Sequence, residues 1–283
     1  MSEQDKILRV ACAQIDCVIG DPKANIAKHQ DWIGRARKKG CDLLVFPELS
    51  LTGYGNWFNI MDVSRRADCI ELRRLAESVG NMKTVVGFIE EGEGGLLYNS
   101  TAWLADGKVE LIQRKLNLPT YGELSEGKFF AKGRSIDLIK FNENWNVATL
   151  ICADVWNPAL VHVAAQNKAT LLVTPIASTL EAVGDGFDNS AGWDLTSRFY
   201  SMIYGLPMVM CNWVGSSGSQ TYWGGSRILD ETGNVAAQGG NDEELLIADL
   251  DYQRLVQARF RLPTIRDADP DLVLRELQRS LLG

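Results

Sequence analysis

Hydrophobic and polar positions follow two periods along the chain, and these periods predict strands and helices in alternation. Runs rich in Val, Ile and Leu predict buried strands, as in ILRVACAQI (7–15), CDLLVFPE (41–48) and WNVATLIC (145–152), and PMVMCNWVG (207–215) predicts one further strand. Apolar residues spaced three and four apart predict an amphipathic helix in NIAKHQDWIGRARKKG (25–40), which ends at Gly40. The pattern is therefore that of an α/β protein.

Hairpins join some of the predicted strands, and helices join others. YNSTAWLADGKVELIQRK predicts a hairpin that turns at Asp106 and Gly107, and further turns are predicted at 142–144 and 230–233. Helical connections are typical of parallel neighbours, so the sheets are expected to be mixed. About ten strands and five helices favour two sheets packed together, with the helices outside.

The organisation of the chain predicts a single domain over residues 1–283. No linker, low-complexity tract or repeat interrupts it, and its length suits one large domain. An irregular segment is predicted over 178–192. Two helices, near 252–261 and 271–282, end the chain, and residues 263–283 are expected to form a C-terminal tail helix.

Composition and charge argue against several classes of partner. The net charge is −7 and no basic stripe is present, so nucleic acid is not an expected ligand. No apolar run approaches the roughly 20 residues that span a bilayer. The start, MSEQDKILRV, has no secretory signal pattern, so a cytoplasmic location is expected. Six cysteines without CxxC spacing and only two histidines predict neither disulfides nor a metal site, and no glycine-rich nucleotide motif follows a strand.

Three chemically complementary side chains are predicted where strong strands end. Glu48 follows LLVF, Lys115 follows VELIQR, and Cys152 follows VATLI. Ligand sites of α/β proteins assemble at strand ends. A thiol with an ordinary pKa near 8.5 needs a base or a nearby cation before it attacks. Glu48 can supply the base, and Lys115 can stabilise both a thiolate and a developing oxyanion.

The motifs around these residues resemble the nitrilase superfamily of carbon–nitrogen hydrolases. The resemblance covers nearly the whole chain and is carried by FPELSLTGY (46–54), RKLNLPTYGELSEGKFFAKG (114–133), LICADVW (150–156), VTPIAS (173–178), MCNWVG (210–215) and GGSRILDETGNV (224–235). It implies a four-layer α-β-β-α sandwich of two mixed sheets. It also implies a Glu–Lys–Cys triad that works without a metal or a cofactor.

The resemblance implies a role for each residue of the triad. Glu48 matches the general base, Lys115 the lysine and Cys152 the nucleophile of the family. A second glutamate often supports such a site. LPTYGELSEGKFF is similar to a segment of the amidase domains of glutamine-dependent NAD synthetases, which assigns this role to Glu126. The spacing in aliphatic amidases assigns it to Glu123 instead, and we prefer Glu126 because the residues that follow it stay in register.

The resemblance further implies positions for the oxyanion and the substrate. The backbone N–H of Ala153 is expected to hold the oxyanion together with the lysine, and Tyr54, Trp156 and Ser178 match pocket positions of the glutaminase-type relatives. Trp156 is equally suited to packing at the start of a helix. CADVW is more similar to amidase domains than to true nitrilases, which favours an amide substrate over a nitrile.

The segment before the 193–204 helix departs from the glutaminase pattern. It contains Glu181, Asp185 and Asp188, and no basic residue before Arg198. Relatives that use glutamine tend to place a basic residue there to hold the substrate carboxylate. If the three acids face the pocket, a cationic or neutral amide fits better than glutamine. The alternative is a solvated surface loop.

Several functions remain open at this point. The first is an amidase that cleaves a small carboxamide or carbamoyl compound and releases ammonia. The alternatives are a glutaminase subunit that supplies a separate synthetase, a nitrilase, and a catalytically silent interaction protein on the same fold. A homodimer or larger homo-oligomer is expected. The tail has an apolar stripe that suits either an interface or its own domain, formed by Leu272, Val273, Leu277 and Leu281.

Overall fold

The computed structural model describes residues 6–55 and 60–282 of the chain. Two six-stranded sheets form its centre. The first has the order β14-β1-β2-β3-β4-β5, and the second has the order β13-β12-β9-β8-β7-β6. Each sheet combines parallel neighbours, β1-β2-β3 and β7-β8-β9, with antiparallel ones. Both sheets are therefore mixed, as the alternation of hairpins and helices predicted.

The strands of the two sheets have the following bounds. The first sheet contains β1 (Ile7–Gln14), β2 (Leu43–Val45), β3 (Lys83–Glu91), β4 (Leu97–Ala105), β5 (Lys108–Arg114) and β14 (Glu244–Asp251). The second contains β6 (Leu138–Lys140), β7 (Asn146–Thr149), β8 (Leu171–Pro175), β9 (Met208–Cys211), β12 (Arg227–Leu229) and β13 (Val235–Gln238). A separate two-stranded hairpin contains β10 (Val214–Ser217) and β11 (Gln220–Trp223).

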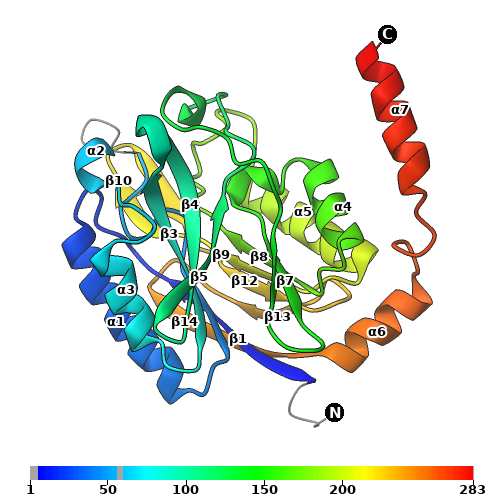
Figure 1. Ribbon diagram of the computed structural model, residues 1–283, viewed down its shortest axis with the longest axis horizontal. Coiled ribbons are helices and arrows are strands. Elements are labelled where there is room, and N and C mark those ends of the chain that lie inside the picture. The colour runs from blue at the N-terminus through cyan, green and yellow to red at the C-terminus, as the bar shows by residue number, and fades with distance from the viewer. Residues whose placement is uncertain (1–5, 56–59, 283) are drawn as a thin grey trace.

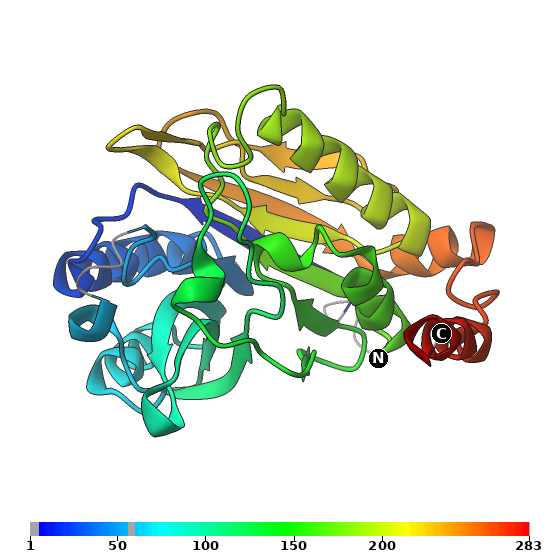
Figure 2. The same cartoon turned by 90° about the horizontal axis from the view of Figure 1, so that it is seen from above.

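Helices cover the outer faces of both sheets. Figures 1 and 2 show α1 and α3 on the side of the first sheet, and α4 and α5 on the side of the second. The α-helices are α1 (Pro22–Lys38), α2 (Ile60–Val63), α3 (Ile70–Ser78), α4 (Pro158–Gln166), α5 (Asn189–Tyr204), α6 (Tyr252–Arg261) and α7 (Pro270–Leu282). Three short 3-10 turns are η2 (Glu93–Gly95), η3 (Glu126–Lys128) and η4 (Cys152–Asp154).

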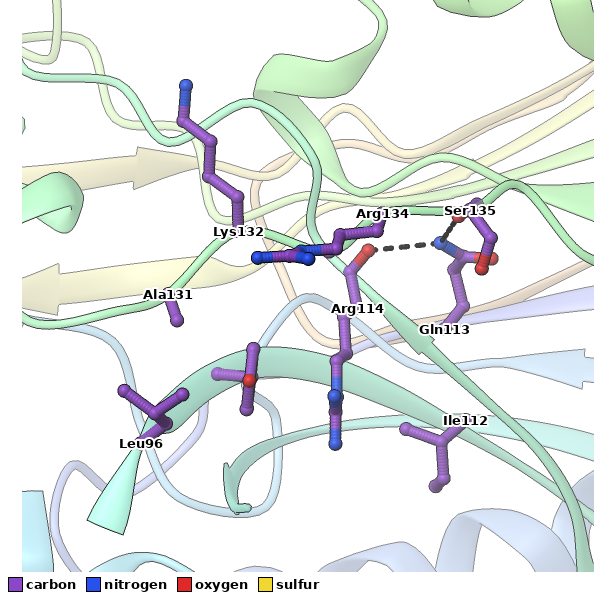
Figure 3. A pocket seen from close by; sticks show the side chains of 10 residues that line it. Leu96, Ile112, Gln113, Arg114, Ala131, Lys132, Arg134 and Ser135 are labelled. Atoms are coloured by element: carbon purple, nitrogen blue, oxygen red, sulfur yellow. Dashed lines mark hydrogen bonds between the residues drawn. The ribbon is translucent and has the colours of Figure 1, made fainter. Parts of the chain in front are cut away.

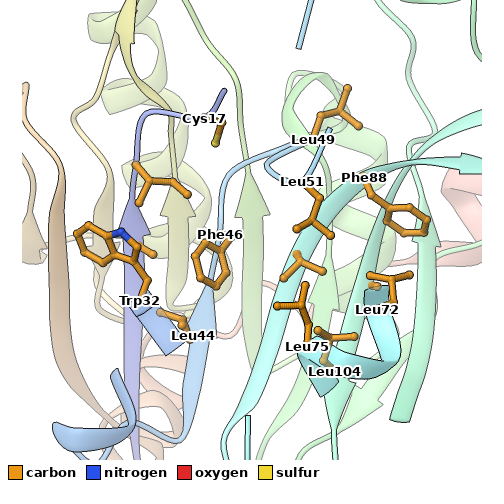
Figure 4. Close-up of a cluster of buried hydrophobic side chains, with 14 of the residues drawn as sticks. Cys17, Trp32, Leu44, Phe46, Leu49, Leu51, Leu72, Leu75, Phe88 and Leu104 are labelled. Atoms are coloured by element: carbon orange, nitrogen blue, oxygen red, sulfur yellow. The ribbon is translucent and has the colours of Figure 1, made fainter. Parts of the chain in front are cut away.

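Three layers of buried hydrophobic side chains lie between the two sheets and the two layers of helices. Successive residues of a strand face opposite sides of a sheet, so β1 directs Val10 between the two sheets and Ala11 toward α1. Figure 4 shows the outer layer of the first sheet, with Trp32 of α1 near Phe46. In the outer layer of the second sheet, Trp193 of α5 packs with residues of β8 and β9. The predicted α-β-β-α sandwich is confirmed.

Hairpin predictions agree with the structure where turn chemistry is strong. β4 and β5 turn at Asp106 and Gly107, which both have positive φ, as tight hairpin turns require.

Two predictions of secondary structure were wrong. α5 begins at Asn189, inside the segment 178–192 predicted to be irregular, because the side chain of Asp188 caps it by accepting from Ala191 N.

The second wrong prediction concerns the single strand expected in PMVMCNWVG (207–215). The chain forms β9 and β10 there instead, and β10 pairs with β11 as a separate hairpin. The interruption falls at Asn212, whose buried side chain binds the backbone of Ser178 and Gly224. A polar residue with these partners ends the strand where a pattern of apolar residues would continue it.

The last helix, α7, lies apart from the two sheets in Figure 1. Residues 270–281 are all exposed, including the apolar stripe that begins at Leu272. The division of the chain into one domain and a tail, and the expected homo-oligomer, stay predictions. In the described residues, the helices are all too short or too polar to cross a bilayer.

Candidate active site

Strand ends of both sheets bring the three predicted side chains into one region. Lys115 follows β5 directly, Glu48 follows β2, and Cys152 opens the η4 turn after β7. The turn that carries Glu48 lies close against β3 at Gly87. A Cβ atom built on Gly87 would come within 2.3 Å of the backbone nitrogen of Leu49, so only glycine permits this approach.

A buried charge cluster forms around Lys115. Its Nζ lies 2.6 Å from Glu48 Oε1 and 2.6 Å from Glu126 Oε1, and all three side chains are fully or almost fully buried. Burial alone lowers the pKa of a lysine, but the carboxylates of Glu126 and Glu48 outweigh this effect and raise the pKa of Lys115 well above its ordinary value. Lys115 is therefore an ammonium group at neutral pH.

Glu126, and not Glu123, lies beside the lysine. Besides Lys115, Glu126 Oε1 accepts a hydrogen bond of 2.7 Å from the hydroxyl of Tyr54. Burial raises the pKa of Glu126, Lys115 opposes the shift, and Glu48 adds to it. Glu123 lies on the surface and uses its backbone N–H to bind Ala182 O. Of the two glutamates, Glu126 has the contact with Lys115 that the supporting role requires, and the role itself stays a prediction.

Glu48 is held by donors on both of its oxygens. Oε1 accepts from Asn99 Nδ2 at 2.8 Å as well as from Lys115, and Oε2 accepts from the backbone N–H of Ala177 at 2.9 Å. Trp213 Nε1 donates to the backbone oxygen of Glu48. Asn99 Nδ2 also lies 3.5 Å from Glu126 Oε2. These donors hold the carboxyl group of Glu48 in one orientation.

Cys152 lies half-buried on a sharp turn and has a strained backbone. Its φ is 46°, a left-handed value that costs free energy in a residue other than glycine. Burial raises the pKa of its thiol well above the ordinary value, and the negative charge of Glu48 raises it further against the opposing effect of Lys115. The backbone N–H of Ala177, which also binds Glu48, favours the thiolate.

Asp154 connects the cysteine turn to the segment after Lys115. Its Oδ1 accepts from the backbone nitrogens of Leu116 and Asn117, at 2.9 and 2.6 Å, and its Oδ2 accepts from Ile151 N at 3.0 Å. Asn117 Nδ2 returns a bond to Ala153 O. Burial raises the pKa of Asp154 to about 7 despite these three donors. The contacts fix the two strand ends relative to each other.

A small pocket opens beside Cys152, with a cavity volume of about 30 Å³. It is lined by Tyr54, Pro119, Tyr121, Leu124, Glu126, Cys152, Ala153, Trp156, Ala177, Ser178, Ala182, Val183, Asn189 and Trp193. This set contains Ala153 and the three predicted substrate residues, Tyr54, Trp156 and Ser178. Lys115, the other predicted oxyanion donor, is fully buried and is not among the lining residues. In the described part of the chain, no three His, Cys, Asp or Glu side chains gather in a way that suits a metal ion.

Ser178 and the two tryptophans form one wall of the pocket. Trp193 Nε1 donates to Ser178 Oγ at 3.2 Å, and Ser178 N donates to Asn212 Oδ1. The rings of Trp156 and Trp193 meet edge to face at 5.1 Å. Trp156 packs just before α4 and also lines the pocket. Its interpretation as a packing residue is therefore compatible with its interpretation as a pocket residue.

The three acids of the 178–192 segment do not line the pocket. Glu181 accepts from the backbone N–H of Thr221, and Asp188 caps α5, while Asp185 is exposed. Ala182 and Val183 line the pocket in their place. The hypothesis that these acids set the charge preference of the site is not supported, and the interpretation as a surface loop fits better.

A second and larger pocket lies behind Lys115, with a cavity volume of about 480 Å³. Figure 3 shows its lining from β5 and the 131–135 segment, including Arg114, Lys132 and Arg134. Glu90 binds the guanidinium of Arg114 at 2.6 Å. The Gly133 backbone N–H, in the lining of this second pocket, donates to Lys115 O. The second pocket contains cations but no nucleophile.

Sequence reasoning missed several residues that position the site. Asn99 is a polar side chain within the buried strand segment YNSTAW. A polar residue inside a buried strand was the sequence signal that could have identified it. Asp154 directly follows the nucleophile turn, but its contacts with Leu116 and Asn117 depend on the packing of distant segments. Tyr121 and Trp193 had no signal beyond being aromatic.

Comparison with known proteins identifies a family and a fold. A family model described as carbon-nitrogen hydrolase matches residues 9–260. The glutamine-dependent NAD(+) synthetase of Thermotoga maritima is 32% identical over 254 residues, which cover 87% of this chain but 42% of the relative. The citrullinase of Francisella tularensis is 27% identical, covering 94% of this chain and 96% of the relative. The crystal structure of a carbon-nitrogen hydrolase from Helicobacter pylori G27 has a TM-score of 0.85 at 22% identity, covering 96% and 98% of the two chains.

Proposed function

The chain belongs to the carbon–nitrogen hydrolase family, whose members act on non-peptide carbon–nitrogen bonds, and we propose that it is an amidase working through a thioester on Cys152. Its substrate is a small carboxamide or carbamoyl compound, and ammonia is released. One observation carries the proposal: a cysteine on a strained turn borders a pocket beside a buried glutamate and ammonium group. The chain spans less than half of the synthetase relative, whose activity as a whole is not assigned to it.

The first half of the reaction forms the thioester. The raised pKa of Cys152 keeps the thiol protonated in the free enzyme, so Glu48 takes the proton as the sulfur attacks the carbonyl carbon. The carbon–sulfur bond forms, and an electron pair moves onto the oxygen. Lys115 has three N–H bonds, of which two point to glutamates. The third, with the N–H of Ala153, stabilises the oxyanion.

The second half regenerates the enzyme. The electron pair returns from the oxygen, the carbon–nitrogen bond breaks, and the leaving nitrogen takes the proton from Glu48. A water molecule then gives a proton to Glu48 and attacks the thioester carbon. The carbon–sulfur bond breaks, Cys152 recovers its proton, and the acid product leaves. Glu126 stays beside Lys115 throughout and keeps it charged.

A glutaminase that delivers ammonia to a separate synthetase is the second candidate. Similarity to a glutamine-dependent NAD(+) synthetase favours it. Similarity to a citrullinase, over nearly the full length of both chains, favours a stand-alone hydrolase of a carbamoyl compound. The two candidates share the same chemistry and differ in the substrate and in the fate of the ammonia.

Ammonia release tests the proposal. The purified chain is assayed with carboxamides, citrulline, glutamine and a small nitrile, and Cys152→Ala serves as the control. Turnover of an amide or a carbamoyl compound that requires Cys152 supports an amidase. Turnover restricted to the nitrile identifies a nitrilase. No turnover, with a Cys152 that also fails to react with iodoacetamide, identifies a catalytically silent protein.

A further inference from the structure

The pocket offers no cation to a substrate carboxylate. Glu126 is the one charged side chain among its lining residues in the described part of the chain. Behind it, Glu48 and Glu126 share the single ammonium group of Lys115. Residues 56–59 lie outside the described residues, but their sequence, NWFN, contains no charged side chain. Two carboxyl groups against one ammonium make the electrostatics of the site unfavourable for a second anion.

Basic residues close in sequence to the pocket residues lie outside the pocket lining. Arg198, the first basic residue after the 178–192 segment, binds Asp194 at 2.9 Å. Arg227 binds the same carboxylate. Lys132 and Arg134 line the second pocket, on the far side of the segment that carries Lys115. None of these four side chains lines the pocket beside Cys152.

Aromatic rings make up much of the pocket wall. Tyr54, Tyr121, Trp156 and Trp193 all line the pocket. Phe187 lies behind Trp156, with ring centroids 5.9 Å apart. Aromatic faces carry partial negative charge, so they attract an ammonium group or an apolar chain and repel an anion. A buried charge without a partner is also costly to bind.

We infer that the amidase selects amides whose far end is an ammonium or an uncharged group, and that it discriminates against a carboxylate near the reacting amide. This inference rests on the proposed function. It disfavours glutamine and citrulline, although relatives are named for both. The reason is the composition of the pocket wall, and not the three acids of the 178–192 segment.

A matched substrate series tests the inference. Three primary amides share a chain of three methylene groups and differ only in the group at its far end, which is an ammonium (4-aminobutanamide), a methyl group (pentanamide) or a carboxylate (glutaramate). We expect kcat/KM for glutaramate to be roughly 30-fold or more below that for pentanamide, since its charge finds no partner. The value for 4-aminobutanamide is expected to exceed that for pentanamide by about 3-fold, through the rings.

Two outcomes overturn the inference. One is a kcat/KM for glutaramate or glutamine equal to or above that for pentanamide. The other is a value for 4-aminobutanamide below that for pentanamide. If turnover is too slow to rank the amides, their protection of Cys152 against iodoacetamide gives the same series as affinities. Rapid Cys152-dependent hydrolysis of glutamine would refute the inference and leave the amidase proposal intact.

A substitution in the pocket wall provides an independent test. Val183 is a half-buried residue of the pocket lining. Val183→Lys adds the missing cation, and we expect it to raise the ratio of glutaramate to pentanamide kcat/KM by about 10-fold. Val183→Met, which adds similar length without charge, should leave the ratio within about 2-fold. An unchanged ratio in Val183→Lys, with both variants folded and active on pentanamide, would contradict the inference. Absence of Cys152-dependent turnover of any amide by the unmodified chain would refute the amidase proposal as well.

Discussion

The two pockets that share the segment around Lys115 differ in almost every property. The pocket beside Cys152 has a volume of about 30 Å³ and is aromatic, with a buried charge cluster on its inner side. The pocket behind it has about 480 Å³ and contains Arg114, Lys132 and Arg134, of which Lys132 and Arg134 are exposed. The second pocket is the larger of the two. The proposed nucleophile, Cys152, lines the first.

The contrast lies in how the cations of the two pockets are held. An ammonium group in water is screened and mobile, whereas Lys115 is fixed between two carboxyl groups in a region that water does not reach. Exposed cations such as Lys132 have no such constraint, and within the part of the chain that the structure describes Lys132 forms no ion pair. Each prediction below tests whether activity depends on the buried groups of the first pocket and not on the exposed cations of the second.

Removal of the nucleophile should have the largest effect. Cys152→Ala is expected to lower kcat by about 10⁴-fold or more, because no other group in the pocket can form the thioester. Ammonia release from the best amide measures it. Cys69→Ala is the matched control, since Cys69 is also a partly exposed free cysteine but lies away from the site, next to α3. Equal losses in both variants would contradict the assignment.

Loss of the ammonium group is expected to be nearly as severe. Lys115→Met should lower kcat by roughly 10²- to 10³-fold, since it removes an oxyanion donor. It also leaves Glu48 and Glu126 facing each other without a cation, so thermal stability should fall. Lys128→Met removes an exposed lysine of the same region and should change neither quantity. An active Lys115→Met enzyme would rule out its role in the reaction.

Glutamate substitutions should separate the two candidates for the supporting role. Glu126→Gln is expected to lower kcat/KM by about 10- to 100-fold. Because the charge of Glu126 raises the pKa of Lys115, its removal should shift the alkaline limb of the pH profile to lower pH. The profile is measured from pH 6 to 10. Glu123→Gln should behave as the unmodified chain, and the reverse result would favour Glu123.

The protonation state of Cys152 in the free enzyme should distinguish two mechanisms. In one, Glu48 removes the thiol proton during the attack, and in the other, Cys152 and Lys115 already form a thiolate–ammonium pair. Burial and Glu48 raise the pKa of Cys152, so its thiolate should be absent at pH 7 and form only above the ordinary thiol range. The difference in absorbance at about 240 nm between the chain and Cys152→Ala measures it across pH. A thiolate signal at pH 7 would indicate that Lys115 outweighs burial.

Charge reversal in the second pocket should have the smallest effect. Lys132→Glu combined with Arg134→Glu should change kcat/KM by less than about 2-fold, as expected for exposed side chains. Steady-state kinetics on the best amide checks this. A large loss would mean that the two pockets act together through the backbone bond from Gly133 to Lys115.

The fold was predictable where hydrophobic pattern and turn chemistry agree. β1, β2 and the β4–β5 hairpin could be predicted because burial on both faces or a Gly turn leaves little choice. The start of α5 and the break between β9 and β10 could not. Both depend on side-chain contacts, of Asp188 with Ala191 and of Asn212 with Ser178 and Gly224. The spacing of hydrophobic residues along the sequence does not reveal such contacts.

The site was predictable in its reactive groups and less so in its surroundings. Glu48, Lys115 and Cys152 were identifiable because each is a reactive side chain directly after an apolar strand, and because the motifs resemble a known family. Asn99 and Asp154 were missed because they position the site through hydrogen bonds to groups that are distant in the sequence. The acids of the 178–192 segment are plausible specificity residues by sequence, but contacts with backbone N–H groups occupy two of them.

The covalent intermediate tests the central claim most directly. The enzyme is mixed with the best amide, quenched in acid within milliseconds, and examined by intact mass and then by peptide mass. We predict a mass increase equal to the acyl group, on the peptide that contains Cys152 and on none of the five other cysteines. An acyl group on another cysteine, or undiminished turnover by Cys152→Ala without any adduct, would contradict the account.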